Sequence, residues 1–321
     1  MSLVRPLAWR DLGVIWRLRS KGVCCDSESA LTHGSNALQM SLKGYLDRGN
    51  GTSTFVWSSN GVRSTAFAQL RKGGNHARVY YISPSGVDIY EHAAIALLDE
   101  MAQASGSCGV HNMIAEVDEG GPEFQVMRKA GFAVYARQEI FHLASQPKLA
   151  ISTLPVREKT VADDPGILSL YLSLVPKIVQ QVDPPPSKSS AGYVLTNDNG
   201  EVAGYLGVAR GPRGVLVRPY LPPEEKDVIK DLVAAFLHLE TRRFRNGVYV
   251  CVRSYQEWMV AALAESGFDL CGQQAVMVKR LVARIKHSVV KPVHTINRGK
   301  VKISSPVVKS VTLAGARVGR E

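Results

Sequence analysis

Two acidic residues, Glu116 and Asp118, flank Val117 at the end of a short apolar run that predicts a strand, Met113–Val117. A carboxylate at a strand end can take a proton from an amine, directly or through one water molecule, and so act as a general base. Single histidines near the ends of predicted elements could do the same, and there are three: His76, His92 and His111. Acidic and histidine side chains are common on protein surfaces, so these residue types alone do not fix a reaction.

The chain lacks the sequence patterns that are typical of several other chemistries. The chain has no P-loop, no Gly-x-Ser-x-Gly turn and no dinucleotide-binding glycine fingerprint. The cysteines form no Cys-x-x-Cys pair and have no histidine cluster at zinc spacing, so we expect no metal site and five free thiols: Cys24, Cys25, Cys108, Cys251 and Cys271. Free thiols are typical of the reducing cytosol, and we expect a cytoplasmic protein.

The net charge of +11 lies mostly at one end of the 321 residues. From Val282 onward, nine lysines and arginines face only Glu321, a net charge of +8 that leaves about +3 for the rest. We therefore expect residues 283–321 to form a basic tail that binds nucleic acid at most non-specifically. The apolar runs are too short to cross a bilayer, so we expect no membrane partner.

An internal repeat organises the chain. Residues 112–143 and 247–279 both read as a strand, a helix, Gly-Phe and a second strand, with a constant offset of 136. Five pairs carry it: Ile114/Val250, Val117/Arg253, Gly131/Gly267, Phe132/Phe268 and Gln138/Gln274. An offset near one domain length predicts two domains, 1–146 and 147–282, before the tail.

In each half, the residue patterns predict a mixture of helices and strands. In the first half a strand, Ala77–Ser83, precedes the helix Ile89–Ser105, and the helix Pro122–Ala130 precedes the strand Val134–Leu143. The second half has the same order, and its first predicted helix is Ile167–Gln181, followed by a break at Asp183-Pro184-Pro185-Pro186.

The element order and three local features resemble the GNAT acyltransferase superfamily. A strand ends in Ile82-Ser83-Pro84, the next helix contains Leu97-Leu98, and a later short helix ends in Lys129-Ala130-Gly131-Phe132, similar to the family's Lys-Leu-Gly-Phe. The resemblance covers residues 2–143 and, more loosely, 156–281. It implies an α+β protein of two tandem GNAT folds, each a mostly antiparallel mixed sheet flanked by helices.

The resemblance also implies a cofactor, acetyl-CoA or another acyl-CoA, and an amine acceptor on a small molecule or peptide. In this family the pantetheine arm lies in a wedge between two diverging strands, and the pyrophosphate binds at the following helix N-terminus. Matched onto this chain, the cofactor residues are Tyr81, Ile82, Ser83, Ser85, Gly86, Val87 and His92. Glu116 and Asp118 are then the candidate bases for direct acyl transfer in the first half.

Two departures from the family pattern motivate an alternative of similar weight to the acyltransferase. The family's glycine-rich turn falls on Ile89, His92 and Ala94, and the usual tyrosine acid is replaced by Met127 in the first half and Leu263 in the second. The alternative is a catalytically inactive GNAT-fold protein that binds a metabolite or a partner chain.

Overall fold

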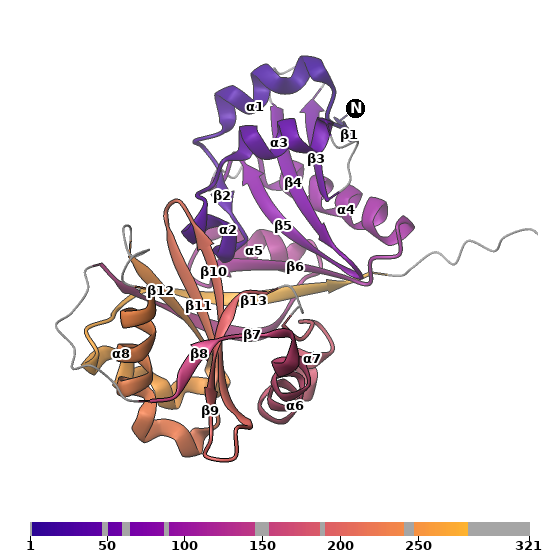
Figure 1. The fold of residues 1–321 in the computed structure, drawn as a ribbon. Helices are drawn as coiled ribbons and strands as arrows, with labels where there is room; N and C mark the ends of the chain where they lie inside the picture. Colours follow the sequence, from indigo (N-terminus) through magenta and orange to yellow (C-terminus); the bar gives the residue numbers. More distant parts are fainter. Residues whose placement is uncertain are drawn as a thin grey trace, which may run out of the picture. The chain divides into compact units, whose positions relative to one another are not determined.

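The computed structural model describes residues 2–46, 51–59, 65–86, 90–144, 154–186, 190–240 and 247–281. Figure 1 shows the strands and helices in chain order. The first half contains β1 (Ser2–Pro6), the 3₁₀ helix η1 (Trp9–Asp11), α1 (Leu12–Leu18), β2 (Val23–Cys24), α2 (Ser27–Thr32), α3 (Ala37–Leu46), β3 (Thr52–Ser59), β4 (Thr65–Gly73), β5 (His76–Ser83), α4 (Glu91–Ser107), β6 (Asn112–Asp118), α5 (Pro122–Lys129) and β7 (Ala133–Leu143).

The second half follows the same plan, and its described residues contain no counterpart of β2. It contains β8 (Val156–Glu158), η3 (Val161–Asp163), α6 (Asp164–Leu174), α7 (Lys177–Gln180), β9 (Gly192–Thr196), β10 (Val202–Gly211), β11 (Gly214–Tyr220), η4 (Pro223–Val228), α8 (Ile229–Glu240), β12 (Val248–Arg253), η5 (Ser254–Met259), α9 (Val260–Glu265) and β13 (Asp269–Arg280). The predicted α+β class is confirmed.

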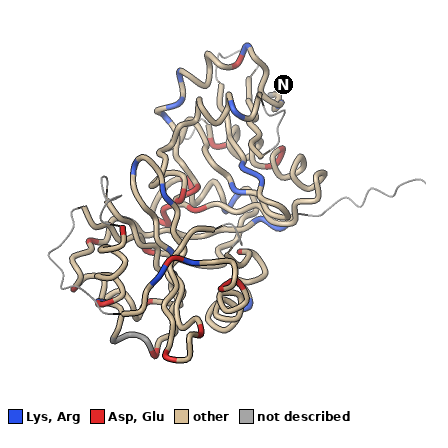
Figure 2. Tube along the Cα trace, in the orientation of Figure 1, with Lys and Arg blue, Asp and Glu red and all other residues tan. Residues whose placement is uncertain are grey.

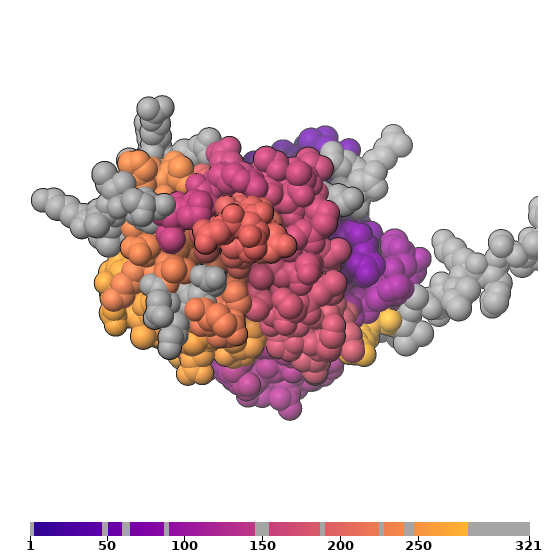
Figure 3. All heavy atoms as spheres, turned by 60° about the horizontal axis from the view of Figure 1, so that its bottom comes forward, coloured from indigo at the N-terminus to yellow at the C-terminus, as the bar shows by residue number. Residues whose placement is uncertain are grey.

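One predicted helix, Ile167–Gln181, was wrong as a single element. The structure has two helices, α6 and α7, because Pro176 forces the preceding Val175 into an extended conformation with ψ of 129°. Residues of both helices pack on the middle of the sheet beside Ile114 and Val276, and Figure 3 shows their outer surface in pink.

The two halves exchange their last strands. The strand order in the described residues is β1-β3-β4-β5-β6-β13-β7-β12-β11-β10-β9-β8, so β13 pairs with β6 of the first half, and β7 pairs with β12 of the second. Residues 1–284 accordingly form one compact unit. The boundary at 146/147 stays a prediction about the repeat, and the predicted tail lies outside the described residues.

The offset of 136 reappears in three dimensions. Gln138 and Gln274 are direct partners in the β7–β13 ladder, and their side chains share a hydrogen bond of 2.8 Å. Ladder irregularities on either side leave one extra residue in each strand, Tyr135 and Cys271, which are also 136 apart. The two halves are therefore related by an approximate twofold axis through the Gln138–Gln274 pair.

A second repeat, with an offset of 152, opens each half. Arg5 makes a bidentate contact with Asp11 at 2.6 and 2.7 Å, and Arg157 contacts Asp163 in the same way at 2.8 and 2.7 Å. Both aspartates also accept a backbone N–H three residues earlier. The shared Arg-x5-Asp spacing extends the duplication to the start of both halves.

Candidate functional site

Each half contains a wedge between two diverging parallel strands. In the first half, β5 and β6 pair only from His76 to Arg78, although β5 runs on to Ser83 and β6 to Asp118. In the second half, β11 and β12 pair only from Val215 to Val217 and then separate in the same way. We call these the first wedge (residues 79–83 and 115–118) and the second wedge (218–220 and 251–253). The partial pairing of β5 and β6 agrees with the wedge that the family resemblance implied.

The first wedge is filled by the chain's own strand β2. Val23 and Cys24 pair with Ile82 and Tyr81 of β5. The next residue, Cys25, joins both walls, because its N–H donates to Tyr80 O and its carbonyl accepts from Glu116 N–H, each at 2.9 Å. These contacts use the backbone edge of β5 to which an extended ligand would pair.

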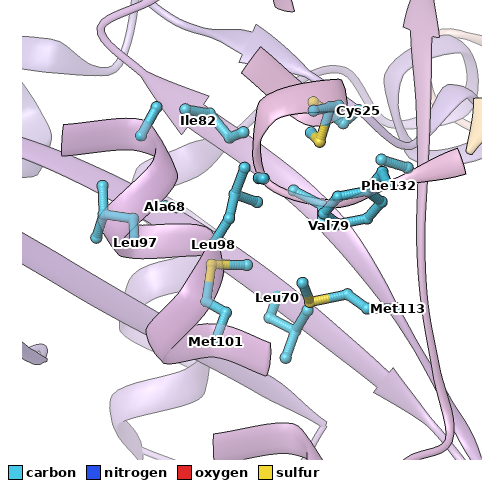
Figure 4. Packing of buried hydrophobic residues seen from close by; sticks show 14 of the residues in the cluster. Cys25, Ala68, Leu70, Val79, Ile82, Leu97, Leu98, Met101, Met113 and Phe132 are labelled. Atoms are coloured by element: carbon cyan, nitrogen blue, oxygen red, sulfur yellow. The ribbon is translucent and has the colours of Figure 1, made fainter. Parts of the chain in front are cut away.

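Side-chain and close-packing contacts hold this segment in place. Cys25 is 1% exposed and lies among the apolar residues enclosed by α4 and the sheet, near Ile82 and Phe132 (Figure 4). Gly22 passes so close to β5 that a Cβ atom there would lie 2.2 Å from Ile82 O. Only glycine therefore fits at this crossing.

Two predicted cofactor residues use their side chains to hold α1 against the sheet. Tyr81 donates its hydroxyl to Arg19 O at 2.6 Å, and Ser83 donates to Leu18 O at 2.7 Å. Both residues are almost fully buried.

A separate surface pocket between α4 and α5 brings together three of the predicted residues: Ile82, Ser85 and Gly86. The Ser85 N–H already donates to Lys21 O at 2.9 Å. Glu91, at the start of α4, forms an ion pair with Lys129 of α5 at 2.6 Å. His92 is exposed and does not line this pocket, and Val87 lies outside the described residues.

The two predicted bases have different environments. Glu116 is 1% exposed, accepts from Ser27 N–H at 2.9 Å and pairs with Arg78 at 3.1 Å. Burial alone would raise the pKa of its carboxyl, but nearby arginines and the Ser27 N–H lower that pKa to about 2. Asp118 is exposed and accepts the N–H of Gly120 at 2.9 Å. Glu116 is thus a buried anion with its oxygens already in use.

The positions expected for a general acid are apolar and enclosed. Met127 is 0% exposed and Leu263 is 1% exposed. Of the histidines, His111 is exposed, and His76 lies at the paired end of β5, away from the wedge. Burial lowers the pKa of His76, with a further contribution from Arg78.

The second wedge has no inserted strand among the described residues and is bridged instead by the side chain of Gln256. Its Nε2 donates to Pro219 O of β11 at 2.6 Å, and its Oε1 accepts from Arg253 N–H of β12 at 3.3 Å. The second half also differs at the positions that correspond, by the offset of 136, to the region of the α4–α5 pocket. There Leu221, Ile229 and Met259 are buried in one apolar cluster.

A cluster of buried and partly buried ion pairs lies where the two halves meet. Asp183 contacts Arg253 at 2.9 Å and Arg78 at 3.4 Å, and Arg218 forms an ion pair with Glu28. Figure 2 shows acidic and basic positions close together in this region. These five residues come from five separate elements and loops, so no local sequence pattern predicted the cluster. The repeat gave one hint of it, because Arg253 takes the place of the apolar Val117 in a predicted strand.

The described residues contain no helix long and apolar enough to span a bilayer. They also contain no group of three His, Cys, Asp or Glu side chains that could hold a metal ion.

Comparisons with known proteins agree with this architecture. No protein-family model and no curated protein sequence matches the chain. Among solved structures, a GCN5-related N-acetyltransferase from Sphaerobacter thermophilus matches with a TM-score of 0.55 and 11% identity, over 87% of this chain and 95% of that one. A tandem GNAT protein from the clavulanic acid biosynthesis pathway matches with a TM-score of 0.52 and 14% identity, over 87% and 98%. At such identities the likeness shows the fold alone, and the chain has a fold similar to that of tandem GNAT proteins.

Proposed function

We propose that this protein uses the GNAT acyltransferase fold to bind a ligand and does not transfer an acyl group. The observation that carries the proposal is β2 in the first wedge. An acyl-CoA arm bound there would have to replace the backbone bonds that Cys25 makes to Tyr80 and Glu116. Each such bond contributes on the order of 1 kcal/mol, and Cys25 would also leave the core.

The chemistry around the wedges supports the same conclusion. The Glu116 carboxylate is buried and held by Arg78 and Ser27, and its lowered pKa makes it a weak base toward an amine. Met127 and Leu263 carry no proton to donate to a leaving thiolate. In the second wedge, Pro219 lacks an N–H, and Gln256 already donates to its carbonyl.

A second candidate is the acetyl-CoA-dependent N-acyltransferase, acting in the first half on an amine of a small molecule or peptide. The pocket lined by Ser85 and Gly86 beside the start of α4 favours it, because a helix N-terminus attracts phosphate groups. This activity requires the segment around β2 to leave the first wedge.

A matched pair of glycine variants separates the two candidates. Gly22→Ala places a methyl group against Ile82 O and so weakens the seating of β2, whereas Gly13→Ala meets nothing within 4 Å. Calorimetric titration of the full chain with acetyl-CoA, and with CoA, measures the consequence. We expect no binding to the wild type or to either variant.

Acetyl-CoA binding to the wild type would contradict the proposal. So would binding that appears or strengthens in Gly22→Ala but not in Gly13→Ala, because it would identify β2 as a removable cover over an acyl-CoA site.

A further inference from the structure

The mouth of the second wedge opens into a cavity with walls from both halves. Arg78 comes from β5 of the first half, whereas Arg218, Arg253 and Asp183 come from the second. The cavity volume is about 150 Å³, roughly ten times the space that one water molecule needs. The cavity is therefore large enough for a small organic molecule.

The charged part of the wall presents three guanidinium groups and one carboxylate. Three acids balance the arginines, namely Asp183, Glu116 and Glu28, but the last two do not line the cavity. Because the cluster as a whole is neutral, it recognises a ligand through directed hydrogen bonds more than through a long-range field. Arginine donors in this setting match the two oxygens of a carboxylate.

One donor in this wall lacks an acceptor. Arg253 is 8% exposed, and its Nη2 donates to Asp183 at 2.9 Å. Its Nη1 is buried and has no hydrogen-bond partner among the described residues. Leaving a buried charged donor unpaired is costly, so an incoming acceptor would be stabilised here.

Apart from Gln256, the remainder of the wall is mostly apolar or aromatic. Tyr171 and Tyr220 lie with ring centres 6.1 Å apart, and the Tyr171 hydroxyl is fixed by donation to Asp183 O at 2.6 Å. Tyr255, Val175 and Val179 complete this side. Such a surface suits the hydrocarbon body of a ligand whose charged end faces the arginines.

We propose that this cavity binds a small organic carboxylate, with its carboxyl group on Arg218 and Arg253 and its apolar body against the tyrosines. This inference rests on the proposed function and names its ligand class. Glu28 holds Arg218 from outside the cavity and does not contact the ligand.

Titration calorimetry on the full chain tests the proposal with benzoate and hexanoate as probes and benzylamine as the cationic control. We expect one-to-one binding of at least one acid with a dissociation constant below about 1 mM, and none of the amine. Arg218→Met removes one of the two guanidinium groups that hold the carboxyl group, and we expect it to weaken binding by roughly tenfold or more. Glu28→Gln breaks the same ion pair but keeps the guanidinium, so binding should remain close to wild type.

Three results would overturn the proposal: no binding of either acid at about 10 mM, equal weakening by both variants, or binding of benzylamine as tight as that of the acids. Thermal melts establish that both variants are folded, which is expected because Arg218 and Glu28 are partly exposed. The titration with acetyl-CoA is independent. Acid binding together with acetyl-CoA binding would contradict the proposed function alone, and absence of both would contradict this cavity alone.

Discussion

The two wedges have the same backbone geometry and different contents. Each begins after three paired residues, yet the first is closed by a strand and the second by a single side chain, Gln256. The difference originates in the segment after the first helix of each half. In the first half it continues into β2, whereas in the second it forms α7 and packs on the middle of the sheet. A repeated fold can thus keep its cleft twice while the connecting segments decide whether a ligand can enter.

The largest expected effect on stability comes from giving the first wedge the residue that the second wedge has at the position of Glu116. Glu116 corresponds to Val252 in the offset of 136, and both are buried. Glu116→Val removes one of the two acidic partners of Arg78 and the acceptor for Ser27 N–H, so we expect a loss of about 3–5 kcal/mol in the free energy of unfolding. Urea denaturation measures this, with Asp118→Val, at an exposed position, as control. Equal effects would show that the buried charge has no special role.

The pH dependence of stability also tests the difference between the buried carboxylate of Glu116 in the first wedge and the apolar Val252 in the second. The lowered pKa of Glu116, about 2, means that its contribution is present above its ordinary value of 4.5 and is lost as the pH falls toward 2. Glu116→Gln should therefore be less stable than wild type at neutral pH and should lose less stability between pH 4.5 and 2. Parallel stability curves for the two proteins would refute the assignment.

The seating of β2 accounts for the next effect. Gly22→Ala should lower the free energy of unfolding by about 1–3 kcal/mol, because the added methyl group collides with β5. Gly13→Ala, on helix α1, should be neutral or stabilise by up to about 1 kcal/mol. Chemical denaturation of both variants compares them. Equal stabilities would mean that β2 does not pack as described.

Opening the second wedge should lower the free energy of unfolding by a smaller amount than disturbing β2 does. Gln256→Ala leaves Pro219 O without its donor and Arg253 N–H without its acceptor, for an expected loss of about 1–2 kcal/mol. Gln273→Ala is the matched control, since that side chain makes an exposed contact. Hydrogen exchange at Arg253 should accelerate in Gln256→Ala alone, and unchanged exchange would argue against a bridge.

The smallest effect concerns an ion pair that both halves share with reversed charges. Glu91–Lys129 in the first half and Lys230–Glu265 in the second are similar pairs: Lys129 and Glu265 are 136 apart, whereas Glu91 and Lys230 are 139 apart. The double variant Glu91→Lys with Lys129→Glu copies the second arrangement and should change stability by less than about 0.5 kcal/mol, because the pair is partly exposed. Thermal melts with the single variants as references measure the change, and a loss above about 1 kcal/mol would show that the orientation matters.

Much of the fold could be predicted from the sequence, because strands such as β5 and β6 are apolar and end at clear turns. The offset of 136 even identified Gln138 and Gln274, which turned out to be partners. The content of the first wedge could not be predicted, because β2 has two residues and no periodicity. The environment of Glu116 depends on Arg78 and Ser27, which lie far from it in the chain. The sequence pattern around Glu116 and Asp118 therefore suggested an available base, whereas the structure has a buried ion pair at Glu116.

The exchange of β7 and β13 has a consequence for the history and engineering of this architecture. A single half made as a separate polypeptide would lack the strand that lies beside its own β6 or β12, and it could obtain one only from a second molecule. The strand order is that of an intertwined homodimer whose two subunits are joined in one polypeptide. Cutting it between residues 144 and 154 should leave two fragments that remain associated.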